Sequence, residues 1–389
     1  MSRVVIIGAG EFGLTAALAL QRRGWSVVVI DPGPVPHPDA ASTDISKVVR
    51  ADYGADPIYT EMAEQSLEGW RAWNAAWGRE LYHEDGFLLM SRDPLAAGGF
   101  EYESHAFLSA RGHRLIRKTA ADLHREHPAW NAERYPAGYL NPRAGWAESG
   151  KVMMQLVLEA RHRCIEMVEG GRFEKLIEHD GRVTGVITHD GCEYLADCVL
   201  MAAGAWTPAL LPWLQHAMWA TGQIVMHFQP RDAEAYRAPQ FPVWAADIGR
   251  TGWYGFPVTA AGIVKVANHG PGVRVDPHEP RIVPADAEDR FRGFLRDTFP
   301  ALAQAPLVAS RLCLYGDTFD GHFWIDHDPG HPGLVVAAGD SGHAFKFAPV
   351  LGDLIADVVE RRPNPWARRF VWREPSAMSS EGARALGER

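Results

Sequence analysis

The stretch VVIIGAGEFGLTAALALQRRGWSVVVIDPG, residues 4–33, decides the fold. An apolar run leads into a glycine pattern, then into apolar residues at helical spacing, and then into a second apolar run, which predicts strand, turn, helix and strand. Gly8 permits a tight turn, Gly10 lets the backbone approach a pyrophosphate at the helix N-terminus, and Gly13 lets the helix pack closely on the strand. Asp31 ends the second strand, where a carboxylate would accept hydrogen bonds from ribose hydroxyls. The stretch therefore predicts a dinucleotide-binding Rossmann unit.

Two later segments favour FAD over NAD as the dinucleotide. Residues 173–208 predict short alternating strands with Asp-Gly turns at 180–181 and 190–191, closing in an apolar run before Gly204. That glycine resembles the second dinucleotide-contact segment of FAD oxidoreductases of the glutathione-reductase type, although a plain β-meander is an open alternative. Residues 322–362 predict a buried strand, a glycine-rich turn with Gly339 and Gly342, and an amphipathic helix running to about residue 361. The partial positive charge of a helix N-terminus would stabilise the anionic edge of a reduced flavin.

These segments predict an α/β fold, of the α+β two-domain kind. A glutathione-reductase-type, FAD-binding Rossmann domain would be discontinuous, from residues 1–85, 145–215 and 320–389. Residues 86–144 and 216–319 are strand-rich and would form an antiparallel-sheet substrate domain over the flavin.

Composition excludes several classes of protein. The chain has 389 residues and a net charge of −9 without a basic block, so nucleic acid is not an expected partner. No apolar run is long enough to cross a membrane. The four cysteines form no C-x-x-C pair, which favours a reducing, cytoplasmic setting and no metal site. The polar end of the chain after about Pro375 is expected to be mobile.

The segment RLCLYGDT, residues 311–318, carries a resemblance to a known family. Over nearly its whole length the chain resembles the monomeric sarcosine oxidase and N-methyltryptophan oxidase family of flavoproteins, with its branch of fructosyl-amino-acid oxidases (amadoriases). That family attaches FAD to the cysteine of a Cys-x-Tyr segment shortly before the last nucleotide-domain strand, and Cys313-Leu314-Tyr315 stands in that place. The resemblance implies covalent FAD on Cys313. A buried cysteine acting as a small hydrophobe is the alternative.

The resemblance also implies the remaining site residues. The segment from Ser42 to Gly54 matches the stretch that runs beside the flavin. The residues it implies as contacts of the cofactor are Ser42, Thr43, Lys47, His343 and Lys346, in addition to the glycines above. Lys47 and Arg50 would supply cations to the active site. Simple solvation of Lys47, and a salt bridge from Arg50 to Asp52 or Asp56, are the alternatives.

Four further positions match the family's pocket: Tyr254, Lys265, His269 and Tyr315. Lys265 matches the oxygen-activating lysine and stands in the apolar run 263–267, where a lysine without a partner is costly to bury. An exposed position on an alternating strand is the other interpretation.

The implied chemistry is oxidation of the C–N bond of a secondary amine in an N-substituted amino acid. Hydride would pass to flavin N5, the imine would be hydrolysed, and O2 would be reduced to H2O2. Arg50 and Lys346 would hold the substrate carboxylate, Tyr254 and Tyr315 would wall the amine, and Lys265 would stabilise the charge that develops on oxygen. An amadoriase of the same family and a flavin dehydrogenase with another electron acceptor are the alternatives. The expected partners are a small-molecule amine and O2, and the expected state is a monomer or weak homo-oligomer.

Some residues depart from the sarcosine oxidase pattern. Asp44 and Asp340 look more like the amadoriase branch, and Arg373 could bind a carboxylate or cap a surface. Trp253 and Trp324 suggest a differently walled pocket, with a place in the core as the ordinary alternative.

Overall fold

The glycine stretch builds the centre of a six-stranded sheet. In the computed structural model, which describes residues 1–375, β1 (Arg3–Ile7) pairs in parallel with β2 (Ser26–Asp31) and β13 (Cys198–Met201). The strand order is β20-β21-β13-β1-β2-β9, which adds β9 (Glu166–Glu169), β20 (Trp324–His327) and β21 (Leu334–Ala338). Only β20 runs antiparallel to its neighbour.

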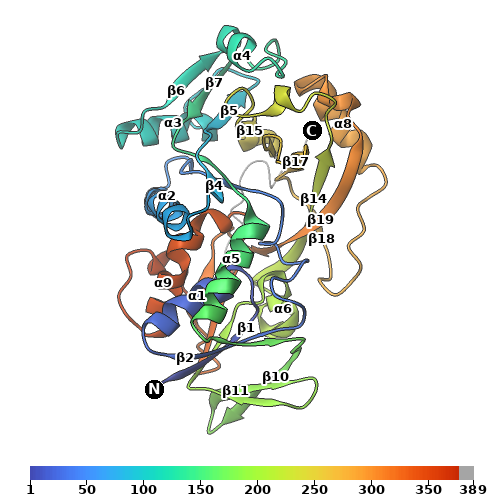
Figure 1. The fold of residues 1–389 in the computed structure, drawn as a ribbon. Coiled ribbons are helices and arrows are strands. Elements are labelled where there is room, and N and C mark those ends of the chain that lie inside the picture. Colours follow the sequence, from blue (N-terminus) through green and yellow to red (C-terminus); the bar gives the residue numbers. More distant parts are fainter. Residues whose placement is uncertain (376–389) are drawn as a thin grey trace.

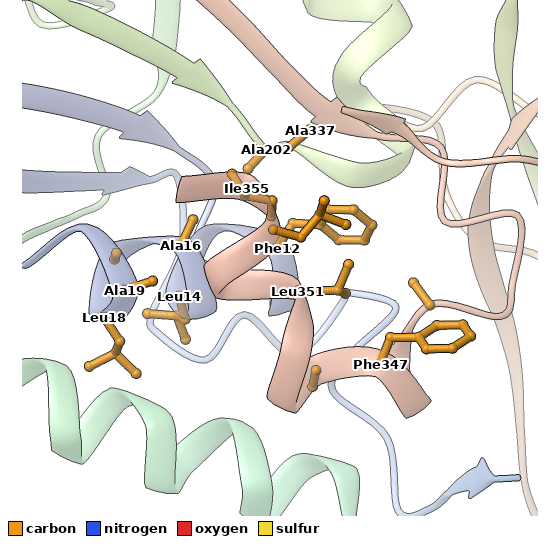
Figure 2. Close-up of a cluster of buried hydrophobic side chains, with 14 of the residues drawn as sticks. Phe12, Leu14, Ala16, Leu18, Ala19, Ala202, Ala337, Phe347, Leu351 and Ile355 are labelled. Carbon is orange, nitrogen blue, oxygen red and sulfur yellow. The ribbon is translucent and has the colours of Figure 1, made fainter. Parts of the chain in front are cut away.

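Helices cover one face of this sheet and a small sheet covers the other. Val4 and Ile6 face a core shared with α1 (Glu11–Arg22), α5 (Ser149–His162) and α9 (Ala348–Val359), whereas Val5 and Ile7 face the sheet of β10 (Phe173–His179), β11 (Arg182–Thr188) and β12 (Glu193–Leu195). Figure 2 shows apolar side chains of α1 and α9 between the two helices. They approach so closely that a Cβ on Gly352 would lie 2.4 Å from the Thr15 carbonyl oxygen.

A nine-stranded sheet forms the other part of the molecule (Figure 1). Its strands are β5 (Phe87–Ser91), β6 (Ile116–Thr119), β7 (Ala137–Asn141), β14 (Met218–Phe228), β15 (Val243–Ala246), β16 (Trp253–Gly255), β17 (Val264–Asn268), β18 (Val273–Arg274) and β19 (Leu307–Thr318). The pairing is antiparallel except between β15 and β5. A third sheet, β3 (Lys47–Val49), β8 (Gly145–Ala147) and β4 (Tyr82–His83), lies where the chain passes between the two parts.

The remaining α-helices of the described residues are α2 (Pro57–Trp77), α3 (Phe100–Ala110), α4 (Ala120–Glu126), α6 (Thr207–Leu210), α7 (Ile248–Thr251) and α8 (Ala287–Thr298). Trp253 stacks on Phe294 of α8 with ring centroids 4.2 Å apart, and Trp324 packs against Trp372. Both tryptophans are fully buried, so their place is the core and the pocket-wall interpretation is wrong.

The structure confirms the α/β fold class, with a mostly parallel sheet around the glycine turn and a second, mostly antiparallel sheet, and it confirms the strands predicted at 4–7, 173–203 and 334–338. The six-stranded sheet draws its strands from residues 1–85, 145–215 and 320–375, and the nine-stranded sheet from 86–144 and 216–319. The division into domains at these boundaries stays a prediction. The last predicted helix begins only at Ala348, after a short 3₁₀ turn. The tail after Pro375 lies outside the described residues.

Candidate active site

Three glycine turns meet at one edge of the six-stranded sheet. β21, β13 and β1 are parallel neighbours, so Gly339, Gly204 and Gly8, which follow them, lie at the same carboxyl-terminal edge. Gly8 has φ +104°, and a Cβ there would lie 2.5 Å from the Ala202 carbonyl oxygen. A Cβ on Gly13 would lie 1.9 Å from the Gly8 carbonyl oxygen, so this glycine lets α1 sit against the turn.

Gly10 and its surroundings leave room for a ligand. The nearest atom that a Cβ on Gly10 would meet is Ser42 Oγ, 3.8 Å away. Ser42 Oγ and Thr43 Oγ1 are enclosed, and within residues 1–375 neither has a hydrogen-bond partner. Enclosed hydroxyls without partners beside a helix N-terminus fit the polar phosphate and ribityl groups of FAD. The described residues therefore fit the dinucleotide predicted from the sequence.

Asp31 is held by the backbone of the turn. Its Oδ2 accepts a hydrogen bond from Ala9 N at 2.8 Å, and its Oδ1 accepts one from Gly33 N at 3.1 Å. Burial raises the pKa of this carboxyl, and the two backbone N–H groups oppose the rise. Asp31 thus fixes the glycine turn, and its contact with a ribose stays a prediction.

One pocket brings together eight of the residues predicted for the site. They are Lys47, Arg50, Tyr254, His269, Tyr315, Gly342, His343 and Lys346, which come from β3, β16, β19 and the loops after β3, β17 and β21. Four apolar side chains that no sequence pattern indicated complete the lining: Val48, Phe87, Ile248 and Phe345. Among residues 1–375, the lining contains three cations and no carboxylate.

Arg50 presents to this pocket a guanidinium that pairs with no acid among residues 1–375. The guanidinium lies 5.0 Å from the Tyr53 ring centroid and 5.8 Å from that of Phe87. Its Nη1 is buried, and the described residues offer this atom no hydrogen-bond partner. Asp52 instead accepts hydrogen bonds from Tyr139 and Asn141, and Asp56 caps α2 and pairs with Arg369. The alternative salt bridges from Arg50 are therefore wrong.

Lys346 is positioned by a chain of hydrogen bonds. Its Nζ donates to Tyr53 Oη at 2.9 Å and to the His343 carbonyl at 2.8 Å. The Tyr53 hydroxyl also lies 3.0 Å from His343 Nδ1, and His343 Nε2 lies 3.0 Å from the Gly321 carbonyl oxygen. A carbonyl can only accept, so Nε2 donates its proton there.

The glycine turn after β21 is pressed against the Cys-x-Tyr segment. A Cβ on Gly342, which has φ +73°, would lie 2.1 Å from the Tyr315 ring. Asp340 fastens the turn to β19 by accepting hydrogen bonds from Gly316 N at 2.7 Å and Gly342 N at 3.2 Å. Burial raises the pKa of Asp340 to about 6. Since Asp340 does not line the pocket, its place is structural.

Cys313 lies behind the pocket on β19. It is buried with Val225, Ala267 and Tyr315, and it is a free thiol. Burial by itself would lower the pKa of Lys47. Electrostatic interactions with Cys313, Asp44 and Tyr254 outweigh burial, so the pKa of this lysine is raised. Cys313 is thus close enough to the Lys47 ammonium to interact with it electrostatically, unlike an ordinary cysteine of an apolar core.

Lys265 is enclosed rather than exposed, since only 1% of its side chain is accessible. Its Nζ donates to Asp44 Oδ2 and to the Ser46 carbonyl, both at 2.6 Å, and lies 4.7 Å from the Phe256 ring centroid. Burial lowers the pKa of Lys265 to about 8, and Asp44 limits the fall. Lys265 is absent from the pocket lining and lies behind it. The exposed-strand interpretation is wrong.

The guanidinium of Arg373 forms hydrogen bonds with other residues of the protein. Its guanidinium makes a two-pronged contact with Asp320, at 2.6 and 2.7 Å, and donates to the Val371 and His322 carbonyls. The structure favours the capping interpretation over the binding of a substrate carboxylate.

Comparison with known proteins identifies the family. The sequence profile of the FAD dependent oxidoreductase (DAO) family matches residues 3–358. The chain belongs to this family. It is 32% identical to L-saccharopine oxidase of Schizosaccharomyces pombe, over 97% of this chain and 95% of that protein, and 25% identical to monomeric sarcosine oxidase of a Bacillus strain, over 91% of each. Among solved structures it is similar to the fructosyl amine:oxygen oxidoreductase Amadoriase I of Aspergillus fumigatus, with a TM-score of 0.82 and 28% identity over 96% of this chain and 89% of that one.

Two further findings concern what residues 1–375 lack. No helix in this range is long and apolar enough to cross a membrane. No three histidine, cysteine, aspartate or glutamate side chains in it gather in a way that would hold a metal ion.

Proposed function

We propose that this FAD-dependent oxidoreductase oxidises the C–N bond of a secondary amine in an N-substituted amino acid. Substrate, O2 and water give an amine, a carbonyl compound and H2O2. FAD, when bound, accepts the hydride from the substrate carbon and passes the electrons to O2. The names of the relatives support this class, because sarcosine, saccharopine and fructosyl amines all carry a substituted amine.

The observation that carries the proposal is Arg50, which has no acid partner among the described residues and lines the pocket together with Lys346. A buried guanidinium without a carboxylate is costly unless a ligand supplies the anion. Among residues 1–375, Arg50 Nη1 has no hydrogen-bond partner, and a substrate carboxylate bound in the pocket that Arg50 and Lys346 both line would supply one. Two cations then fix the substrate's orientation. Tyr254 and Tyr315 exclude water from the amine, which favours its uncharged form.

Cys313 is proposed as the covalent FAD anchor, supported by its place on β19 next to Lys47. Wild-type flavin should stay with the protein after acid precipitation, and Cys313→Ala should release it or lack it. Cys198→Ala removes another buried free cysteine and is the matched control. Release of flavin from the wild type would end this assignment.

Lys265 is proposed to stabilise the negative charge that develops as O2 is reduced. Lys265→Met should slow reoxidation of the reduced enzyme at least tenfold and leave anaerobic reduction nearly unchanged. We also propose a cytoplasmic location, which the four free cysteines support. The proposed state is a monomer or weak homo-oligomer.

The deciding experiment is anaerobic flavin bleaching with N-methylglycine and N-fructosylglycine, which differ only in the group on nitrogen. Bleaching by either substrate supports the proposed reaction, and the faster one tells whether the pocket prefers a methyl or a sugar substituent. The N-methylamide of N-methylglycine, which lacks the carboxylate, should bleach far more slowly. Equal bleaching by the amide would remove Arg50 and Lys346 from their roles.

A further inference from the structure

Asp44 lies between two lysines behind the pocket. Its Oδ2 is 2.6 Å from Lys265 Nζ and 3.8 Å from Lys47 Nζ. The side chains of Asp44 and Lys265 are 2% and 1% exposed, whereas Lys47 reaches into the pocket lining. A buried carboxylate therefore links an enclosed ammonium to one that faces the site.

The backbone holds Asp44 in one place. Its carbonyl accepts hydrogen bonds from Ser149 Oγ at 2.8 Å and Gly150 N at 2.7 Å, at the start of α5. Its Oδ1 accepts one from Ile45 N at 2.7 Å, which leaves Oδ2 for the lysines. Asp44 belongs to the loop between β2 and β3, and Lys265 to β17 of the other sheet. The ion pair thus bridges the two parts of the molecule.

Few other charges reach this cluster. His227 lies opposite Lys265 on β14, and burial lowers its pKa to about 4, so it is uncharged at neutral pH. Arg311 is engaged with the Thr43, Pro38 and Ala40 carbonyls. Burial raises the pKa of Tyr254, so its hydroxyl is uncharged at neutral pH. Glu11 and Asp340 are two more acids that act on Lys47, and burial raises the pKa of both. Without Asp44, Lys265 would face Lys47 with no ion-pair partner among the described residues, and would lose its proton more readily.

We propose that Asp44 is a positioning residue for oxygen reduction: its carboxylate keeps Lys265 in place and charged beside Lys47. The inference rests on the proposed role of Lys265. It predicts that Asp44→Asn leaves Lys265 largely neutral near pH 7.5 although the lysine itself is untouched. Asp44→Glu keeps the charge and should retain most of the effect.

The test measures flavin reduction and reoxidation separately by stopped flow, from pH 6 to pH 9.5. Asp44→Asn should slow reoxidation at pH 7.5 at least tenfold, recover toward the wild-type rate as the pH falls to 6, and change reduction less than threefold. Lys265→Met should be slow at every pH. If Lys265→Met is slow but Asp44→Asn follows the wild-type pH profile, the inference is overturned and the proposed function stands. If Lys265→Met reoxidises normally, the role of Lys265 itself is overturned, and the inference with it.

A second readout does not depend on turnover. Asp44→Asn removes the ion-pair partner of the buried Lys265. Either burying the unpaired ammonium or removing its proton then costs stability, so the variant should unfold at a lower temperature than the wild type. The double variant Asp44→Asn/Lys265→Met removes both charges and should unfold at a higher temperature than Asp44→Asn alone. A double variant no more stable than Asp44→Asn would show that the two side chains are not coupled, which overturns the inference.

Discussion

At the scale of single residues, the charges that lack a partner carry the functional information. Arg50 is surrounded by aromatic rings and has no acid to neutralise it among the described residues. Hydrogen bonds to charged groups contribute about 1.5–3 kcal/mol, so Arg50→Gln should raise the KM for a carboxylate substrate roughly 10- to 150-fold. Arg92→Gln, which removes a half-buried arginine next to Tyr135 away from the pocket, should leave KM unchanged. An unaltered KM in Arg50→Gln would show that the carboxylate binds elsewhere.

The sequence could suggest some of these residues and not others. A lysine in an apolar strand predicts a buried partner for Lys265, but its partner is 221 residues away in the chain. Tyr53, Phe87 and Ile248 gave no local signal of a role in the site, because periodicity reports only which face a residue occupies. Asp44 stood out only through its resemblance to the amadoriase branch. The resemblance supplied the other contacts.

At the scale of elements, the glycine turn after β1 must let α1 pack closely against it and must also leave room for the pyrophosphate. Substitutions at Gly13 and Gly10 test these two requirements separately. Gly13→Ala would place a Cβ 1.9 Å from backbone that cannot move aside, so we expect a loss of at least about 1–3 kcal/mol in the free energy of unfolding. Gly10 has an ordinary extended φ of −77° and open space before it, so Gly10→Ala should cost the fold less than about 1 kcal/mol. Because that space is where the pyrophosphate is expected, Gly10→Ala should nevertheless purify with little flavin.

Thermal unfolding and the flavin content per chain check both variants. The contrary result would be a Gly10→Ala protein that is fully flavin-loaded, or a Gly13→Ala protein as stable as the wild type. The strands and helices of this turn were predictable because glycine spacing and apolar periodicity are local properties. The late start of α9 could not be predicted from local sequence. The 3₁₀ turn at Phe345–Phe347 precedes it, and the Lys346 carbonyl in this turn accepts hydrogen bonds from Ser66 and Trp70 on α2, which is distant in the chain.

At the scale of the whole molecule, the site exists only where the two parts meet. Lys47 and Arg50 come from the chain beside the six-stranded sheet, whereas Tyr254 and Tyr315 come from the nine-stranded sheet. The packing of the two parts against each other also encloses Lys265, and burial lowers the pKa of this lysine from 10.5 to about 8. Between these two values the unfolded chain binds more protons than the folded protein, so the contribution of Lys265 to stability rises with pH across that window.

The same pKa predicts a pH dependence for the proposed oxidase reaction. If the ammonium of Lys265 is the working form, the rate of reoxidation by O2 should fall as the pH rises through about 8, where the proton is lost. Anaerobic reduction should instead rise with pH, because the substrate amine reacts in its uncharged form. Stopped-flow measurement of the two half-reactions from pH 6.5 to 10 checks both slopes, and Lys265→Met should remove the fall in reoxidation near pH 8. A reoxidation rate constant up to pH 10 in the wild type would mean that the charge on Lys265 does not assist the transfer of electrons to O2.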